Sequence, residues 1–142
     1  MLDAPVADAM NVYTHRHGLT FSSIRSIAAG MGDDDIPNLC KERGMVALVS
    51  ANTQDFGKKL RLYEALLANG VSVIVMRPSD KRQALTPERQ VAIISGNVQA
   101  MATRLRDATG PILLKIMQSG TVPYRTIEEI LADAESRKKK LP

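Results

Sequence analysis

Residues 45–50 read MVALVS, and residues 51–57 read ANTQDFG. The first of these two segments is almost wholly apolar and has the length of one β-strand. Such a run is typical of a strand buried on both faces, as in a parallel sheet. Parallel strands need crossover connections, which are usually helices. This stretch therefore predicts an α/β fold, and the elements around it test that interpretation.

Helical and strand patterns alternate on both sides of this segment. Gly44 is a predicted C-cap, Pro37 falls in the first turn of its helix, and Thr86 precedes a proline at a helix start. Residues 126–129, TIEE, form a capping box that opens the last helix. Helices are predicted at 6–16, 33–43, 58–69, from 87 onward and from 127 onward, and strands at 1–3, 19–24, 45–50, 71–76 and 111–117.

This alternation predicts βαβ units with right-handed crossovers. The expected fold is a three-layer sandwich with a central, mostly parallel sheet covered by helices on both faces. A length of 142 residues fits one domain, residues 1–142, and the chain ends in a basic tail at residues 136–142.

Composition narrows the class of protein. No apolar run approaches the roughly 20 residues that span a bilayer, and no signal-peptide pattern opens the chain, so we expect no membrane partner. Cys40 is the only cysteine and is expected in the core, which excludes an internal disulfide and fits the cytoplasm. The net charge of +4 favours a polyanionic partner such as RNA.

Carboxylates far apart in the sequence follow the predicted strands. Asp3 ends the first strand, Asp33-Asp34-Asp35 opens the helix after the second, and Asp55 follows the third. In a parallel sheet these positions share the carboxyl edge, where ligands bind. Clustered carboxylates need a counter-charge, and a hard cation such as Mg²⁺ takes oxygen ligands. A metal-bound water is a better nucleophile towards phosphate, so the pattern predicts metal-assisted phosphodiester hydrolysis.

Each residue also has a structural interpretation. One or more of Asp33, Asp34 and Asp35 can be an N-cap, and Asp55 can be a turn residue. Asp3 has no evident structural role. Asp80 is expected to be a solvated loop charge.

The spacing from Asp33 through Ile36 and Gly44 to residues 45–57 resembles the PIN-domain pattern. In that pattern an Asp opens a helix, a Gly ends it, an apolar strand follows, and a loop of the type Asn-x-x-Asp-Phe closes the site. Residues 71–77 and 110–122 resemble a compact PIN-like branch among VapC-type toxins. The resemblance extends over nearly the whole chain.

The resemblance implies a Mg²⁺- or Mn²⁺-dependent endoribonuclease that is neutralised by a cognate antitoxin and is a homodimer. Carried over residue by residue, the metal-binding and catalytic positions fall on Asp3, Asp33 and Asp55, with Asn52 as their polar companion. Candidates for contacts to the RNA backbone are Arg25, Lys58, Lys59 and Arg82.

Two features depart from the family pattern and leave an alternative open. The second acidic residue of the pattern, usually Glu, has no counterpart except Asp8, and only two residues precede Asp3 where a full strand is expected. The alternative is a PIN-like module that binds RNA or protein without catalysis. A receiver domain ranks lower, because Asp3 is unpaired and Asp55 lies five residues beyond Ser50.

Overall fold

The computed structural model describes residues 35–50, 56–78, 85–130 and 132–133, with the side chains of residues 56–59 excepted. These residues form an α/β unit whose sheet has four strands in the order β1-β2-β3-β4. Its elements are α3 (Ile36–Glu42), β1 (Ala47–Ser50), α4 (Phe56–Ala68), β2 (Ser72–Met76), α5 (Pro87–Asp107), β3 (Leu113–Met117) and β4 (Gly120–Tyr124). Residues 127–130 and 132–133 are also helical. The predicted helix at 6–16 and the predicted strands at 1–3 and 19–24 lie outside the described residues.

The prediction of a mostly parallel sheet is confirmed for the described strands. β1 pairs with β2 and β2 with β3 in parallel, with Val49 opposite Ile74 and Ile74 opposite Leu114. β4 is antiparallel to β3 and follows it through a tight turn at residues 118–119, directly before Gly120, which has a φ of 144°. The sequence analysis predicted no strand after residues 111–117, so β4 is a correction to it.

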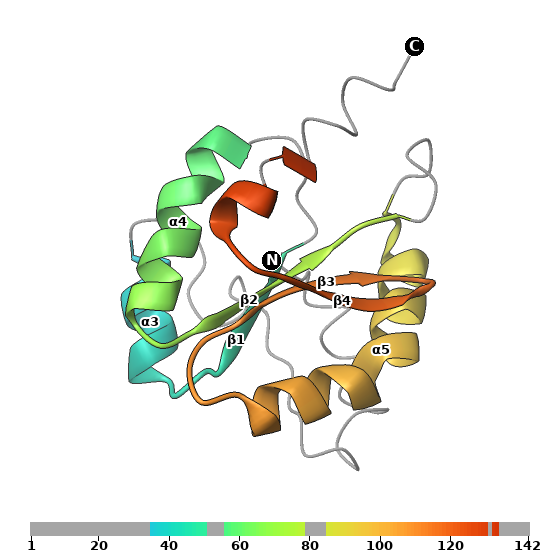
Figure 1. Cartoon of the computed structure of the whole chain (residues 1–142), viewed down its shortest axis with the longest axis horizontal. Helices are drawn as coiled ribbons and strands as arrows, with labels where there is room; N and C mark the ends of the chain where they lie inside the picture. Colours follow the sequence, from blue (N-terminus) through green and yellow to red (C-terminus); the bar gives the residue numbers. More distant parts are fainter. Residues whose placement is uncertain (1–34, 51–55, 79–84, 131, 134–142) are drawn as a thin grey trace.

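Helices cover both faces of the sheet, as Figure 1 shows with α3 and α4 on one side and α5 on the other. One core cluster joins α3, α4 and Ile130 of the last helix to alternate strand residues, among them Val73 and Val75. The other joins α5, through Ile94 and Met101, to the intervening strand residues. The period-two alternation along the strands sends successive side chains into these two cores. The arrangement is consistent with a three-layer fold.

Element ends follow local chemistry. Gly44 and Gly70, which end α3 and α4, have φ of 65° and 77°, in the left-handed region that glycine adopts without strain. Thr86 caps α5 by accepting a hydrogen bond from the backbone N–H of Arg89. Half of the predicted capping box forms, since the Thr126 hydroxyl accepts from the N–H of Glu129. The Glu129 carboxylate accepts from the N–H of Arg125, one residue before the cap.

The helix predicted at 33–43 begins later, at Ile36, with Asp35 in the N-cap position. The Asp35 side chain makes no capping hydrogen bond, so the cap interpretation is wrong for this residue. The strands predicted at 45–50 and 111–117 begin at Ala47 and Leu113. Met45 packs against a core cluster, whereas Val46 is 62% exposed. The continuous burial expected for residues 45–50 therefore holds only for the later part of this segment.

The two outer strands of the described sheet differ in burial. In β1, Leu48, Val49 and Ser50 are all buried. In β4 only Tyr124 is buried, while Val122 is 43% exposed and Pro123 is exposed. Among the described strands β4 pairs only with β3, and its side chains are more exposed than those of β1.

Candidate functional site

The four residues predicted to form the site, Asp3, Asp33, Asn52 and Asp55, lie outside the described residues. The same holds for Asp8, Asp34 and Asp80, for the candidate RNA contacts Arg25 and Arg82, and for the basic tail at 136–142. The backbone of Lys58 and Lys59 is described and falls in the first turn of α4.

The described elements define the edge of the sheet to which these segments attach. β1 and β2 run in parallel, so Ser50 and Met76 both lie at the carboxyl edge. α4 begins at Phe56, after a five-residue connection from Ser50, and α5 follows β2, so both helices begin at this edge. α3 runs back from it, because its C-terminus leads into the start of β1. Asn52 and Asp55 belong to the connection between β1 and α4, and Asp33 is three positions before Ile36.

A buried hydrogen bond joins the end of β1 to the middle of α4. The Tyr63 hydroxyl of α4 donates to the Ser50 hydroxyl at the end of β1 over 3.2 Å. Tyr63 is 1% exposed and Ser50 is 3% exposed. The bond satisfies two polar groups in the core and holds the middle of α4 against the end of β1.

Two hydrogen-bond donors, from β3 and β4, and one cation just after β2 converge on one carboxylate oxygen of the last helix. Asp133 Oδ2 accepts from the Tyr124 hydroxyl over 2.7 Å and from Lys115 Nζ over 3.4 Å, and it lies 3.9 Å from Arg77 Nε. Arg77 follows β2 directly, and its side chain is fully buried. We call Arg77, Lys115, Tyr124 and Asp133 the Asp133 cluster.

The Asp133 cluster carries opposite charges in a poorly solvated position. The side chains of Lys115 and Asp133 are 17% and 21% exposed, respectively. Burial, and then the hydrogen bond to Asp133, raise the pKa of Tyr124 far above its ordinary value, while the Arg77 charge opposes that rise. The phenol therefore stays protonated and keeps donating to Asp133. Lys115 Nζ also lies 5.4 Å from the centroid of the Tyr124 ring.

Sequence reasoning missed Arg77 and Asp133, although both carry a signal. Arg77 is a charge that directly follows the apolar run Val71–Met76, where a solvated residue is not expected at an interior strand. Asp133 is three positions after Ile130, which is fully buried, and so falls on the apolar face of the last helix. A charge on an apolar face marks a residue that has a buried partner.

Cys40 conforms to its predicted structural role. It is fully buried in the core cluster beneath α3 and α4, and burial raises the pKa of its thiol. A thiol held protonated is a poor nucleophile.

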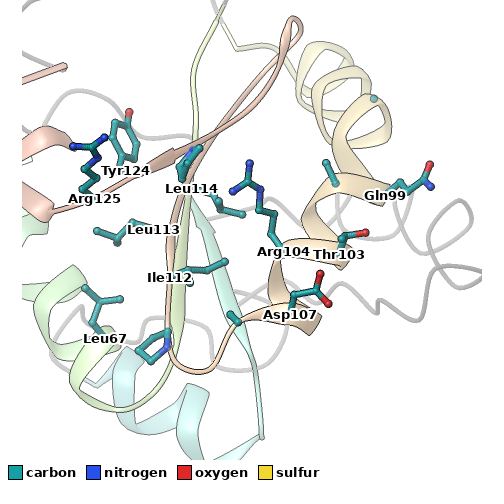
Figure 2. A pocket seen from close by; sticks show the side chains of 15 residues that line it. Leu67, Gln99, Thr103, Arg104, Asp107, Ile112, Leu113, Leu114, Tyr124 and Arg125 are labelled. Carbon is teal, nitrogen blue, oxygen red and sulfur yellow. The ribbon is translucent and has the colours of Figure 1, made fainter.

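A groove of about 1070 Å³ lies between the second half of α5 and the strands β3 and β4. In Figure 2, Arg104 extends from α5 towards the strands, and Asp107 lies one turn further along the helix. Because α5 runs from the carboxyl edge to the amino edge, the groove lies towards the amino edge of the described strands. Its walls are open and mix apolar strand residues with solvent-exposed helix residues.

Within the described ranges, no three His, Cys, Asp or Glu residues are grouped so as to hold a metal ion. Among the described helices, none combines the length and apolar character needed to cross a membrane. No protein-family model matches the chain, and neither a curated protein nor a solved structure matches it significantly.

Proposed function

We propose that the chain is a PIN-like, divalent-metal-dependent endoribonuclease, with Asp3, Asp33 and Asp55 as the metal-binding and catalytic carboxylates and Asn52 beside them. The observation that carries the proposal is the connection from β1 to α4. Buried Ser50 leads into the loop that holds Asn52 and Asp55, and α4 begins at the residue after Asp55. The chain thus anchors both ends of this loop at the carboxyl edge of a parallel sheet, where such folds bind ligands.

The proposal also requires a partner for β1. For Asp3 to reach Asp55, the predicted strand at residues 1–3 must lie along the outer side of β1. β1 has the burial of an interior strand, unlike β4 at the opposite side of the described sheet. Helices cover both faces of β1, so a strand added on its outer side would extend a sheet that already lies within the core.

RNA is the proposed substrate because cationic groups occur at the same edge. Lys58 and Lys59 fall in the first turn of α4, and α5 begins at this edge too. Helix N-termini carry partial positive charge and exposed N–H groups, which suit phosphate. The net charge of +4 acts in the same direction.

The donor set fits Mg²⁺ or Mn²⁺, because three carboxylates and one amide supply oxygen ligands. When bound, the metal activates a water and stabilises charge on the attacked phosphate. The chain itself then has two tasks, to hold the carboxylates close together and to bind the RNA backbone through Lys58 and Lys59. In the cytoplasm, a cognate antitoxin would neutralise a homodimer of this chain.

The test is metal-dependent cleavage of structured RNA by the purified protein. We expect cleavage with Mg²⁺ or Mn²⁺, none with chelator, and a loss of at least a hundredfold in rate for Asp3→Asn and Asp55→Asn. Asp35→Asn is the matched control, because it removes one carboxylate near Asp33 whose side chain makes no capping bond. If Asp55→Asn cuts as fast as Asp35→Asn, the site assignment is wrong.

The second candidate function is a PIN-like module that binds RNA or protein without catalysis. The absence of a second acidic residue other than Asp8 between Asp3 and Asp33 favours it. Metal-independent RNA binding without cleavage in the same assay would support this candidate and contradict the first.

A further inference from the structure

The groove between the second half of α5 and the strands β3 and β4 has an apolar side and an open side. Leu114 belongs to the core cluster beneath α5, Ile112 packs against that cluster, and Pro123 lies opposite Leu114 in the β3–β4 pair. On the helix side the lining includes Gly96 and Ala100, which are exposed and have little or no side chain. A Cβ built on Gly96 would meet no atom within 4 Å. The groove therefore has room for apolar side chains that come from outside.

The groove carries more positive than negative charge. Its lining includes the guanidinium groups of Arg104 and Arg125 and one carboxylate, that of Asp107. All three residues are exposed, and none of the three side chains forms an ion pair with another residue in the described ranges. Arg104 extends from α5 towards the strands in Figure 2, and Arg125 follows the end of β4. A partner with negative charge would thus meet a cation from the helix and a second one beyond the strand.

The size of the groove fits a segment of polypeptide better than a small molecule. Its volume of about 1070 Å³ is at the upper limit of small-molecule pockets, which span about 300–1,000 Å³, and its walls are open. Apolar contact area together with arginine is typical of interfaces between proteins. Single-stranded RNA fits less well, because its bases stack on aromatic rings, and Tyr124, the aromatic residue of this lining, is buried.

The shape of β4 favours a helix over an added strand as the occupant. A strand added to β4 would need backbone hydrogen bonds along its outer edge, and Pro123 has no N–H to donate. A helix forms its own backbone hydrogen bonds and contacts a groove through its side chains alone. Residues spaced three and four apart would place its apolar side chains in the groove and its charged ones at the borders.

We propose that this groove binds an acidic amphipathic helix of a partner protein. Apolar side chains of that helix enter between α5 and the β3–β4 pair, and carboxylates beside them pair with Arg104 and Arg125. The inference goes beyond the proposed function and does not depend on it, because the groove consists of described residues and lies towards the amino edge.

The test measures the binding of two synthetic amphipathic peptides to the full chain by fluorescence anisotropy. Both peptides have leucine and alanine along one helical face, and the remaining positions are glutamate in one peptide and lysine in the other. We expect the acidic peptide to bind roughly tenfold more tightly than the basic one, because it gains two ion pairs at the groove. Equal or tighter binding of the basic peptide would overturn the proposal.

A charge reversal tests whether the two arginines are the contacts. The variant is Arg104→Glu/Arg125→Glu, and the matched control is Lys41→Glu/Arg43→Glu, which makes the same change of charge at exposed residues where α3 ends. We expect the groove variant to bind the acidic peptide roughly tenfold more weakly than the control does, and to bind the basic peptide more tightly than wild type does. Equal affinities of the two variants would mean a general charge effect and would overturn the proposal.

A second variant fills the groove without changing its charge. Gly96→Tyr places a ring in the open space on α5 and removes a glycine from the interior of a helix, which favours folding. Ala92→Tyr is the matched control, at an exposed position of the same helix outside the groove. We expect only Gly96→Tyr to weaken binding of the acidic peptide, and equal affinities would contradict the proposal. Displacement of this peptide by single-stranded RNA, or self-association of the chain that Gly96→Tyr abolishes, would assign the groove to another occupant and overturn it.

Discussion

A single carboxylate oxygen, Oδ2 of Asp133, brings together groups that the sequence keeps far apart. Tyr124 donates to it, Lys115 pairs with it, and buried Arg77 lies 3.9 Å away. Charge inside a protein is costly unless it is compensated nearby. The carboxylate thus makes the burial of Arg77 tolerable and attaches the last helix to the sheet.

We predict that Asp133→Asn lowers the free energy of unfolding by about 3 kcal/mol, near the lower end for a broken buried pair, because the Asp133 side chain is 21% exposed. Asparagine keeps the size and an acceptor for Tyr124 but removes the negative charge opposite Arg77. The measurement is urea unfolding. Glu128→Gln, an exposed charge change on the same helix, is the control and should stay within about 0.5 kcal/mol of wild type. Equal midpoints for the two variants would contradict this role of Asp133.

Tyr124 gives the cluster a pH dependence at the alkaline end. Its pKa is raised in the folded state, so the folded protein holds the phenolic proton more tightly than the unfolded chain does. The resulting stability is fully present below the unfolded pKa of about 10 and is lost as pH rises above it. We predict that wild type loses up to about 1.4 kcal/mol per pH unit above pH 10 from this group, and that Tyr124→Phe does not. Urea midpoints from pH 8 to 11 test this, and parallel profiles for the two proteins would disprove it.

At the scale of elements, the sequence predicted most of what the structure describes. α4 and α5 follow from apolar residues spaced three and four apart, and the glycines at positions 44 and 70 mark helix ends. β2 follows from the run at residues 71–76, which is apolar except for Ser72. These signals are local, so the sequence of each of these segments was enough to predict its own secondary structure.

β4 was missed because its local signals contradict its structure. Gly120, Thr121, Val122, Pro123 and Tyr124 contain one glycine and one proline, both unfavourable in strands. The strand forms because β3 offers a pairing edge and α5 holds the hairpin. Asn97 of α5 donates to the carbonyl of Met117 over 2.8 Å and accepts from the hydroxyl of Thr121 over 2.7 Å. Tertiary contact thus overrides local preference here.

We predict that Asn97→Leu lowers the free energy of unfolding by about 1–3 kcal/mol, because it removes these bonds from a residue that is 3% exposed. Hydrogen exchange should show increased opening at residues 117–121. Gln99→Leu, at an exposed position on the same helix, is the matched control and should have little effect on either measurement. Unchanged protection of the hairpin in Asn97→Leu would show that α5 does not hold it.

At the scale of the whole molecule, the sequence predicted the carboxyl edge from which α4 and α5 begin, but it did not predict the Asp133 cluster. The edge follows from the order of strands and helices, which local patterns reveal. The Asp133 cluster depends on the packing of the last helix against three strands, which no local pattern specifies. The arrangement of Asp3, Asp33, Asn52 and Asp55 stays a prediction.

The proposed metal site makes a prediction about global stability. If metal binds only the folded state, a hundredfold excess over Kd adds about 2.7 kcal/mol to its stability. We expect Mg²⁺ or Mn²⁺ to raise the melting temperature of wild type and of the control Asp35→Asn, and to raise that of Asp55→Asn much less. Equal metal-induced shifts in all three proteins would exclude Asp55 as a ligand.

β4, which pairs only with β3 among the described strands, affects the tendency of the chain to aggregate at high concentration. An exposed strand edge is a template on which further copies can stack into fibrils. Pro123 has no N–H to contribute, and it lies in the middle of the exposed part of β4 beside Val122. The residue that hid β4 from sequence reasoning thus interrupts the ladder along which aggregates would grow. β4 thus pairs with β3 through one edge, while Pro123 hinders the pairing of another chain with its other edge.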